Sequence, residues 1–278
     1  MLSLTSVLAL ALATGMFIFS HGNLPENKRS KQQLLFDIAA RDGDDHSIEL
    51  LLNDPSVDVN EAWESGSFPL LIASQNGHTK VVSLLLNHDS IDVNQVSTKK
   101  SCCVTALALA CQEGHTEVVS LLLGMENIVV NVTTNGGDTP LYLASLHGHT
   151  QVVSMLLDKE GIDVNQATGD GSTPLMVALE RNHTRVASLL LNKEDIDVNQ
   201  ATKVGVTPLL LACQYGRTEM VSMLLGKEGI EVNQVWNGAT PLHYAMHYGH
   251  EKVVKLLILH GVNMTNIRMT VIKGTDNL

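Results

Sequence analysis

Short apolar stripes recur along this chain with polar turns between them. In Thr150–Leu157 the apolar residues fall where one face of a helix would present them, and the preceding run Leu141–Ala144 forms a shorter stripe. Gly148 separates the two runs, at a place where helices often end in the left-handed conformation. This segment therefore predicts two short helices joined by a tight turn.

The two-helix pattern returns at a nearly constant spacing. The proline of a recurring Thr-Pro pair, or its equivalent, falls at Pro69, Ala106, Pro140, Pro174, Pro208 and Pro241, in steps of 37, 34, 34, 34 and 33 residues. Leu34–Leu52 fits the same template without a Thr-Pro pair. A period in this range indicates stacked units that cannot bury their apolar faces alone, so we expect seven repeats over residues 32–266.

One unit, Thr139–Gly171, carries the motifs of a known family. Thr139 and Pro140 suit a helix start, Ile162–Asn165 alternates like a short strand, and Gly169–Gly171 predicts a hairpin turn. This helix–turn–helix–hairpin with TPL, GH and D-V-N motifs resembles the ankyrin repeat. The resemblance implies an all-α repeat solenoid with β-hairpin fingers. Only Thr240–His243 reads TPLH, so we expect the family's Thr–His hydrogen bond in that copy alone.

Charge and motifs argue against several functions. The net charge is −11, and Lys99-Lys100 is the only basic pair inside the array, which disfavours direct nucleic-acid binding. The sequence has no HExxH, GxSxG or phosphate-loop motif, so we expect no enzyme activity, cofactor or metal. The histidines of one slot recur with the repeat and are interpreted as structural: His78, His115, His149, His183 and His250, with Arg217 in the sixth copy.

The four cysteines do not form a disulfide framework. Cys111 and Cys213 occupy the same helix position three repeats apart and are interpreted as small buried residues. Cys102 and Cys103 are adjacent in one enlarged hairpin, Gln95–Val104. The glycosylation motifs at Asn131, Asn182 and Asn263 all fall on positions that the repeat itself explains.

The N-terminal segment leaves the compartment open. Leu2–Phe19 is mostly apolar and uncharged, with basic residues after it at Lys28, Arg29 and Lys31. It fits a signal peptide of about 22 residues, a membrane anchor that keeps the repeats in the cytosol, or neither. We therefore divide the chain into residues 1–22, a linker at 23–31, the array at 32–266 and a tail at 267–278. The localisation is secretory, membrane-anchored or cytoplasmic.

Partner binding is expected on positions that vary between repeats. The resemblance implies contacts at the fingertips and at the ends of the first helices, with a protein as partner and the chain a monomer. The candidate residues at these helix ends are Gln75, Asn76, Gln112, Glu113, Leu146, His147, Glu180, Arg181, Gln214, Tyr215, His247 and Tyr248. Trp63 and Trp236 are candidate exposed anchors on two fingertips, with the alternative that each indole folds back onto its neighbouring hairpin. A membrane-tethered adaptor and an exported effector that binds a host protein remain as alternatives.

The two ends of the array differ in polarity. The first copy carries an unusual polar load, including Asp37, Asp44 and Asp45, which predicts a solvent-facing cap. The last copy has Leu257, Ile258 and Leu259 on its second helix, which predicts poorer capping.

Overall fold

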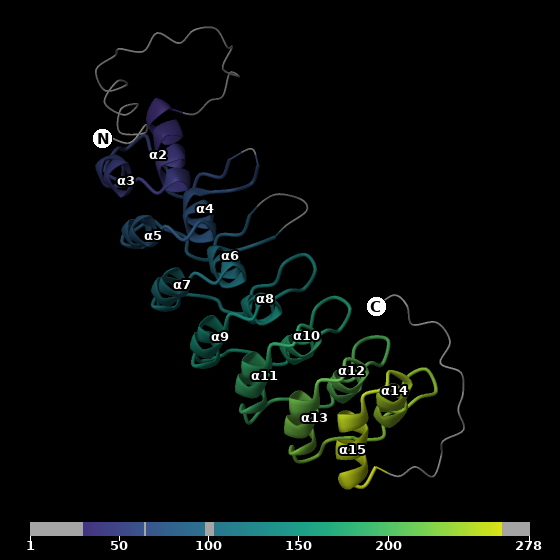
Figure 1. The fold of residues 1–278 in the computed structure, drawn as a ribbon. Coiled ribbons are helices and arrows are strands. Elements are labelled where there is room, and N and C mark those ends of the chain that lie inside the picture. Colours follow the sequence, from purple (N-terminus) through teal and green to yellow (C-terminus); the bar gives the residue numbers. More distant parts are fainter. Residues whose placement is uncertain (1–29, 64, 98–102, 263–278) are drawn as a thin grey trace. The chain divides into compact units, whose positions relative to one another are not determined.

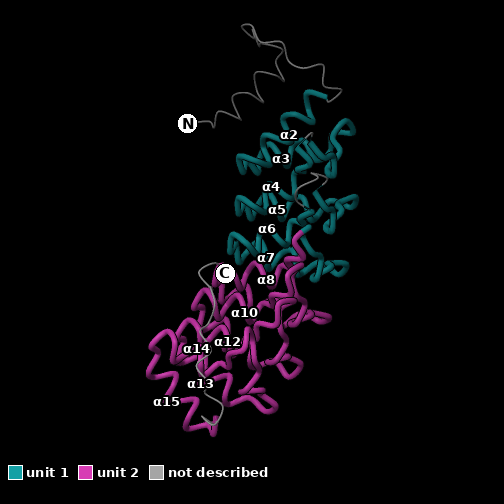
Figure 2. The backbone as a smooth tube through the Cα atoms, turned by 90° about the vertical axis from the view of Figure 1, so that its right-hand side faces the viewer, with its two compact units in different colours: residues 1–135 teal, residues 136–278 magenta. Residues whose placement is uncertain are grey.

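The computed structural model describes residues 30–63, 65–97 and 103–262. Two compact units are distinguished, residues 1–135 and 136–278, coloured teal and magenta in Figure 2. Several predictions lie outside the described residues: the Leu2–Phe19 segment, residues 23–29 of the linker, Lys99-Lys100, Cys102, Asn263 and the tail. Of the helices within the described ranges, none combines the length and apolar character needed to cross a membrane.

The described part of unit 1 holds three helix pairs, here repeats 1–3. Their bounds are α2 (Lys31–Asp42) with α3 (Asp45–Leu51), α4 (Pro69–Gln75) with α5 (Thr79–Leu86), and α6 (Ala106–Glu113) with α7 (Thr116–Leu123). First helices pack on first helices, α2 on α4 and α4 on α6, and the second helices α3, α5 and α7 pack in the same order (Figure 1). Each repeat in the unit thus contacts its neighbours.

The described part of unit 2 holds four pairs, here repeats 4–7. Their bounds are α8 (Pro140–His147) with α9 (Thr150–Leu157), α10 (Pro174–Glu180) with α11 (Thr184–Leu191), α12 (Pro208–Gln214) with α13 (Thr218–Leu225), and α14 (Pro241–His247) with α15 (Glu251–Leu259). The first helices again pack in sequence order, as do the second helices. The stacked helix pairs confirm the predicted all-α repeat architecture.

The core of each repeat is aliphatic, as the apolar stripes predict. In α9 the side chains of Val152, Val153, Leu156 and Leu157 are buried. A fully buried alanine recurs on the first helices, where a small side chain allows two helices to approach: Ala73, Ala110, Ala144, Ala178, Ala212 and Ala245.

The recurring threonine begins most first helices by accepting a backbone hydrogen bond. The Oγ1 atom of Thr139 accepts the N–H of Tyr142 at 3.0 Å. The same bond recurs at Thr105, Thr173 and Thr207. In the last copy Thr240 Oγ1 lies 2.7 Å from His243 Nδ1, which confirms the expected Thr–His bond.

The recurring histidine closes the first helix of the preceding repeat. The Nε2 atom of His78 lies 2.9 Å from the Arg41 carbonyl oxygen, and a Cβ built on Gly43 would lie 2.7 Å from Nδ1 of the same ring. Only glycine leaves room for the ring at that position. The arrangement recurs with His115, His183 and His250, which reach the carbonyls of Gln75, Leu146 and Gln214. The structural interpretation of this slot is confirmed for these four histidines.

The hairpin asparagine holds the loop of the next repeat. Asn165 donates from Nδ2 to the carbonyl of Asp195 at 2.7 Å, and its Oδ1 accepts the N–H of Asp197 at 2.8 Å. The same pair of bonds recurs at Asn60, Asn94 and Asn199. Gln33 has this role at the start of the array, because its amide donates to the Asp58 carbonyl and accepts the Asp58 N–H.

The prediction of a strand at Ile162–Asn165 is wrong. The Asp163 carboxylate accepts the N–H of Asn165 at 3.0 Å, and this Asx turn bends the backbone away from an extended course. The fingers themselves are present as tight hairpins, such as the one closed by the N–H of Thr168 and the Ser172 carbonyl at 2.9 Å. Within the described residues, the isolated β-bridge lies between Trp236 and Ala239.

Candidate functional site

The predicted contact residues lie in pairs at the ends of the first helices. The carbonyls of Gln75, Leu146, Glu180 and Gln214, the first members of four pairs, each accept a hydrogen bond from the His or Arg slot of the next repeat. Exposed members are Asn76, Glu113, His147, Arg181, His247 and Tyr248, and half-buried members are Gln75, Gln112, Leu146, Glu180 and Tyr215. Gln214 is the exception, because only 8% of it is exposed and its Oε1 atom is buried. The expectation that Gln214 presents its side chain to a partner is therefore wrong.

Rings and a guanidinium gather at the helix ends of repeats 6 and 7. We name Tyr215, Arg217, His247, Tyr248 and His250 the ring cluster. The Arg217 guanidinium lies 5.6 Å from the centroid of the Tyr215 ring. The Tyr248 ring meets His247 edge-on at 4.9 Å and stacks on His250 at 6.2 Å. The cluster joins side chains from two consecutive repeats of unit 2.

Two charged side chains of repeat 5, Glu180 and Arg181, interact electrostatically with Tyr215 of the ring cluster. Partial burial raises the pKa of the Tyr215 hydroxyl, and the nearby Glu180 carboxylate adds to the increase. The Arg217 and Arg181 guanidinium groups oppose this increase in the Tyr215 pKa. Tyr215 therefore interacts with an acid, two guanidinium groups and the Tyr248 ring, a combination suited to recognising polar and aromatic groups of another protein.

The repeat architecture has a direct match among known families. A family profile for ankyrin repeats in three copies matches residues 35–134, 94–168, 127–202, 160–235 and 195–268. The chain belongs to the ankyrin repeat family. A comparison with curated proteins gave no match. Ankyrin repeats generally bind proteins and are typically non-catalytic, and only ankyrin repeats are matched in this chain.

The two fingertip tryptophans differ from the expectation of two exposed anchors. Trp236 is only 8% exposed, and its ring stacks on Tyr244 at 5.6 Å in a small core with Val206 and Leu210. Of the two alternatives for this position, the folded-back indole is the one observed, because the ring packs on α14 and on the neighbouring ankyrin repeat. Trp63 is half-buried, and its Nε1 atom is buried without a hydrogen-bond partner among the described residues.

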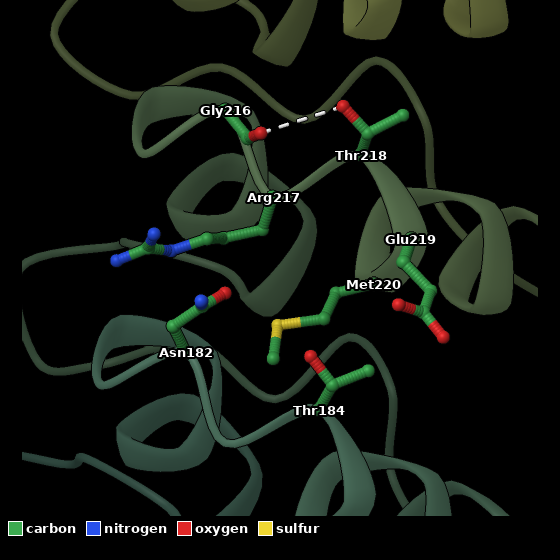
Figure 3. A pocket seen from close by; sticks show the side chains of 7 residues that line it. All are labelled: Asn182, Thr184, Gly216, Arg217, Thr218, Glu219 and Met220. Carbon is green, nitrogen blue, oxygen red and sulfur yellow. Dashed lines mark hydrogen bonds between the residues drawn. The ribbon is translucent and has the colours of Figure 1, made fainter.

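One ankyrin turn departs from the Gly–His pattern and forms a pocket. Asn182 stands in the glycine position with a φ of 63°, and Arg217 stands in the following histidine position. Arg217 donates from Nη2 to the Glu180 carbonyl at 3.1 Å, replacing the histidine bond. Figure 3 shows both residues on one side of a pocket of about 300 Å³, with Glu219 on the other. Asn182 is exposed at the helix turn, as its repeat position predicts.

The cysteine interpretation is confirmed, and the described residues offer no metal site. Cys111 and Cys213 are free and fully buried, and burial raises the pKa of both thiols. Across residues 30–63, 65–97 and 103–262, no group of three or more His, Cys, Asp or Glu side chains could hold a metal ion.

Most members of the ring cluster are among the residues predicted from the sequence, but the contacts that join them are not. Tyr215, His247 and Tyr248 stand in the variable positions, whereas His250 and Arg217 stand in the slot interpreted as structural. The sequence does contain one signal for Arg217. It is the residue that replaces the recurring histidine of this slot in repeat 6.

Proposed function

We propose that this ankyrin chain is a non-enzymatic scaffold that binds another protein through the first-helix ends of repeats 5–7. The observation that supports the proposal is the ring cluster, in which Tyr215, His247 and Tyr248 combine with Arg217 next to Arg181. Tyrosine and arginine are the residue types, with tryptophan, that most often dominate binding energy at protein interfaces.

The scaffold holds these side chains in place before a partner arrives. Tyr248 stacks on the His250 ring, and that ring is fixed by its 2.9 Å contact with the Gln214 carbonyl. The backbone beneath the cluster is helical. Binding therefore loses little conformational freedom, which favours affinity.

The corresponding positions in unit 1 are less suited to anchor a partner. Asn76 donates from Nδ2 to the Arg41 carbonyl at 3.0 Å, and Gln112 donates to the Glu113 carboxylate at 2.9 Å. These amides already satisfy local hydrogen bonds and carry no ring. We therefore assign the main contact to unit 2, with Gln75, Asn76, Gln112 and Glu113 as secondary contacts.

Affinity capture with substituted full chains tests the assignment. The partner is captured with the wild-type chain, identified by mass spectrometry and then titrated against variants. Tyr215→Ala, His247→Ala and Tyr248→Ala should each weaken binding about tenfold or more, since truncation of an interface anchor costs about 2 kcal/mol. Arg185→Ala, an exposed cation on the second helix α11, is the matched control and should bind like the wild type.

Two outcomes would contradict the proposal. If the three alanine variants bind normally while Asn76→Ala or Glu113→Ala weakens capture, the contact surface lies in unit 1. If Arg185→Ala weakens binding as much as Tyr248→Ala, the partner contacts the second helices instead. Thermal unfolding of each variant separates lost contacts from lost folding.

The uncharged Leu2–Phe19 segment favours a second form of the same function. In this form the segment is retained as an anchor, and the repeats recruit a partner to a membrane surface. The alternatives are export after cleavage and a cytoplasmic chain. Intact mass of the expressed protein tests this, because loss of about 22 residues identifies cleavage. Membrane fractionation of the uncleaved chain then separates a tether from a soluble protein.

A further inference from the structure

Successive fingers of unit 2 are joined by a series of backbone hydrogen bonds. The N–H of Gly169, in the finger of repeat 5, donates to the Gly136 carbonyl at 2.7 Å. The N–H of Lys203, in the finger of repeat 6, donates to the Asp170 carbonyl at 2.9 Å. Gly136 and Asp170 stand at the same place in their fingers, each followed by a glycine with a positive φ. The backbone of one finger therefore covers the tip carbonyl of the finger before it.

The series ends at the finger of repeat 6. Val204 is the next tip residue by register, and among the described residues no N–H donates to its carbonyl. The finger of repeat 7 closes between Trp236 and Ala239, three positions apart, whereas the two preceding fingers close across four positions. Asn237 and Gly238 form its turn, both with a positive φ. This shorter finger leaves the Val204 carbonyl open.

The spacing of neighbouring fingers is a second, independent observation. A Cβ built on Gly137 would lie 2.8 Å from a backbone nitrogen of the next finger, and one on Gly171 would lie 2.7 Å from its equivalent. A Cβ built on Gly205 meets only the Trp236 ring, at 3.7 Å. Backbone thus packs on backbone at the first two fingers, whereas no backbone of the described residues comes equally close to the third.

The side chain at the open carbonyl is apolar. Val204 is 64% exposed, and it stands where the earlier fingers carry Gly136 and Asp170. Val235, which precedes Trp236 on the next finger, is 61% exposed. Exposed apolar side chains beside open backbone groups are typical of an edge that pairs with another chain.

We propose that an extended apolar segment of the partner protein adds to the finger of repeat 6. A backbone N–H of the segment donates to the Val204 carbonyl, and a β-branched side chain of the segment packs on the Val204 side chain. Such strand addition takes affinity from main-chain hydrogen bonds and specificity from alternate side chains. The proposal rests on the proposed binding function, because it names a second contact for the same partner.

The preceding fingers indicate this kind of occupant. The carbonyls of Gly136 and Asp170, equivalent to that of Val204, are each covered by a backbone N–H and not by a side chain. A second copy of this chain is disfavoured, because a net charge of −11 on each copy opposes association of two identical chains. A segment of a different protein does not meet this repulsion between copies.

A neutral synthetic peptide, Ac-Ser-Val-Thr-Val-Thr-Val-Ser-NH2, tests the edge without the captured partner. Its valines and threonines favour an extended backbone. Added to the full-length chain, it should shift the amide NMR signals of residues 203–206 and 235–239 and leave those of α2 and α3 unchanged. The same peptide with every backbone nitrogen methylated has no main-chain donor and should bind at least about tenfold more weakly.

Val204→Asp is the matched protein variant. Asp170 stands at the equivalent place of the preceding finger, so the variant should fold normally and bind the unmethylated peptide about tenfold more weakly. The control is Val129→Asp, at a valine of unit 1 that is 50% exposed and stands where a later repeat has Asp163. This control and Tyr248→Ala should both bind the peptide like the wild type.

Four outcomes would overturn the proposal. The first is an absence of shifts at residues 203–206, and the second is equal binding of the methylated peptide. The third is equal weakening by Val129→Asp or Tyr248→Ala, which would place the peptide elsewhere. The fourth is a shift of residues 203–206 with protein concentration alone, which would identify a second copy as the occupant. Loss of partner capture in Tyr248→Ala tests the ring cluster separately, so failure of one proposal is distinguishable from failure of the other.

Discussion

Asn182 and Arg217 form a paired departure from the Gly–His contact that links neighbouring repeats. A Cβ on Gly148 or Gly216 would lie 2.5 Å from the histidine ring of the next repeat. Asn182 carries that Cβ, so a histidine at position 217 would overlap it. The longer Arg217 side chain avoids the overlap and still donates to the Glu180 carbonyl at 3.1 Å. Asn182 in place of glycine and Arg217 in place of histidine are therefore two parts of one structural change.

A double-mutant cycle tests this coupling. Arg217→His alone should lower the free energy of unfolding by about 1–3 kcal/mol, because the imidazole ring overlaps Asn182. Asn182→Gly alone should change it by less than about 1 kcal/mol. The double variant restores the usual pair and should recover the loss, giving a coupling of about 1–2 kcal/mol. Urea unfolding measures all four proteins, and strictly additive changes would contradict the coupling.

The buried Trp236 should be a stability residue. Trp236→Ala removes a ring packed on Tyr244, Val206 and Leu210, and should cost about 3–5 kcal/mol. Val235→Ala is the matched control, because Val235 is 61% exposed on the same finger and should change stability by less than about 0.5 kcal/mol. Chemical denaturation measures the stability of both variants, and hydrogen exchange reports the local effect at α14. An unchanged midpoint for Trp236→Ala would mean that the indole leaves this core in solution.

The asparagine hydrogen bonds between repeats should contribute more to the free energy of unfolding than their exposed positions suggest. Asn199→Asp replaces the donor to the Gly229 carbonyl with an anion that faces that carbonyl, and should cost about 1–3 kcal/mol at neutral pH. Asn53→Asp makes the same chemical change at an exposed position after α3, and should cost less than about 0.5 kcal/mol. Thermal unfolding compares the two, and equal losses would contradict the assigned role of Asn199.

The buried thiols should be unreactive in the folded protein. Burial raises the pKa of Cys111 and Cys213, so the nucleophilic thiolate is disfavoured at pH 8. Iodoacetamide should label half-buried Cys103 first and reach Cys111 and Cys213 only in urea. Peptide mapping in a Cys102→Ser background assigns each label. Labelling of Cys213 at the rate of Cys103 without denaturant would show that this core opens readily.

Much of the fold could be predicted because the same spacing of apolar and turn residues recurs in each repeat. Thr139, Ala144 and the valine–leucine stripe of α9 act within one helix pair, where spacing along the chain determines contact. The bonds of Asn165 and His183 were not predicted, since they join atoms that only stacking brings together. Burial of Trp236 was left as one of two alternatives for the same reason, because nothing local to its finger reveals Leu210 beneath the indole. The ring cluster depends on neighbouring repeats and was predicted only as a set of separate positions.

The asparagine bonds also determine where this protein can change in length. Asn60 reaches backbone groups 30 and 32 residues ahead, and Asn94 reaches groups 33 and 35 residues ahead, yet both make the same two bonds. The longer span contains the enlarged finger, whose base is closed by the N–H of Ser97 and the Val104 carbonyl at 2.9 Å. Insertions between Ser97 and Val104 therefore leave the helix stack in register. This finger can therefore accept a foreign loop with a new binding specificity, by evolution or by design, while the helix stack stays unchanged.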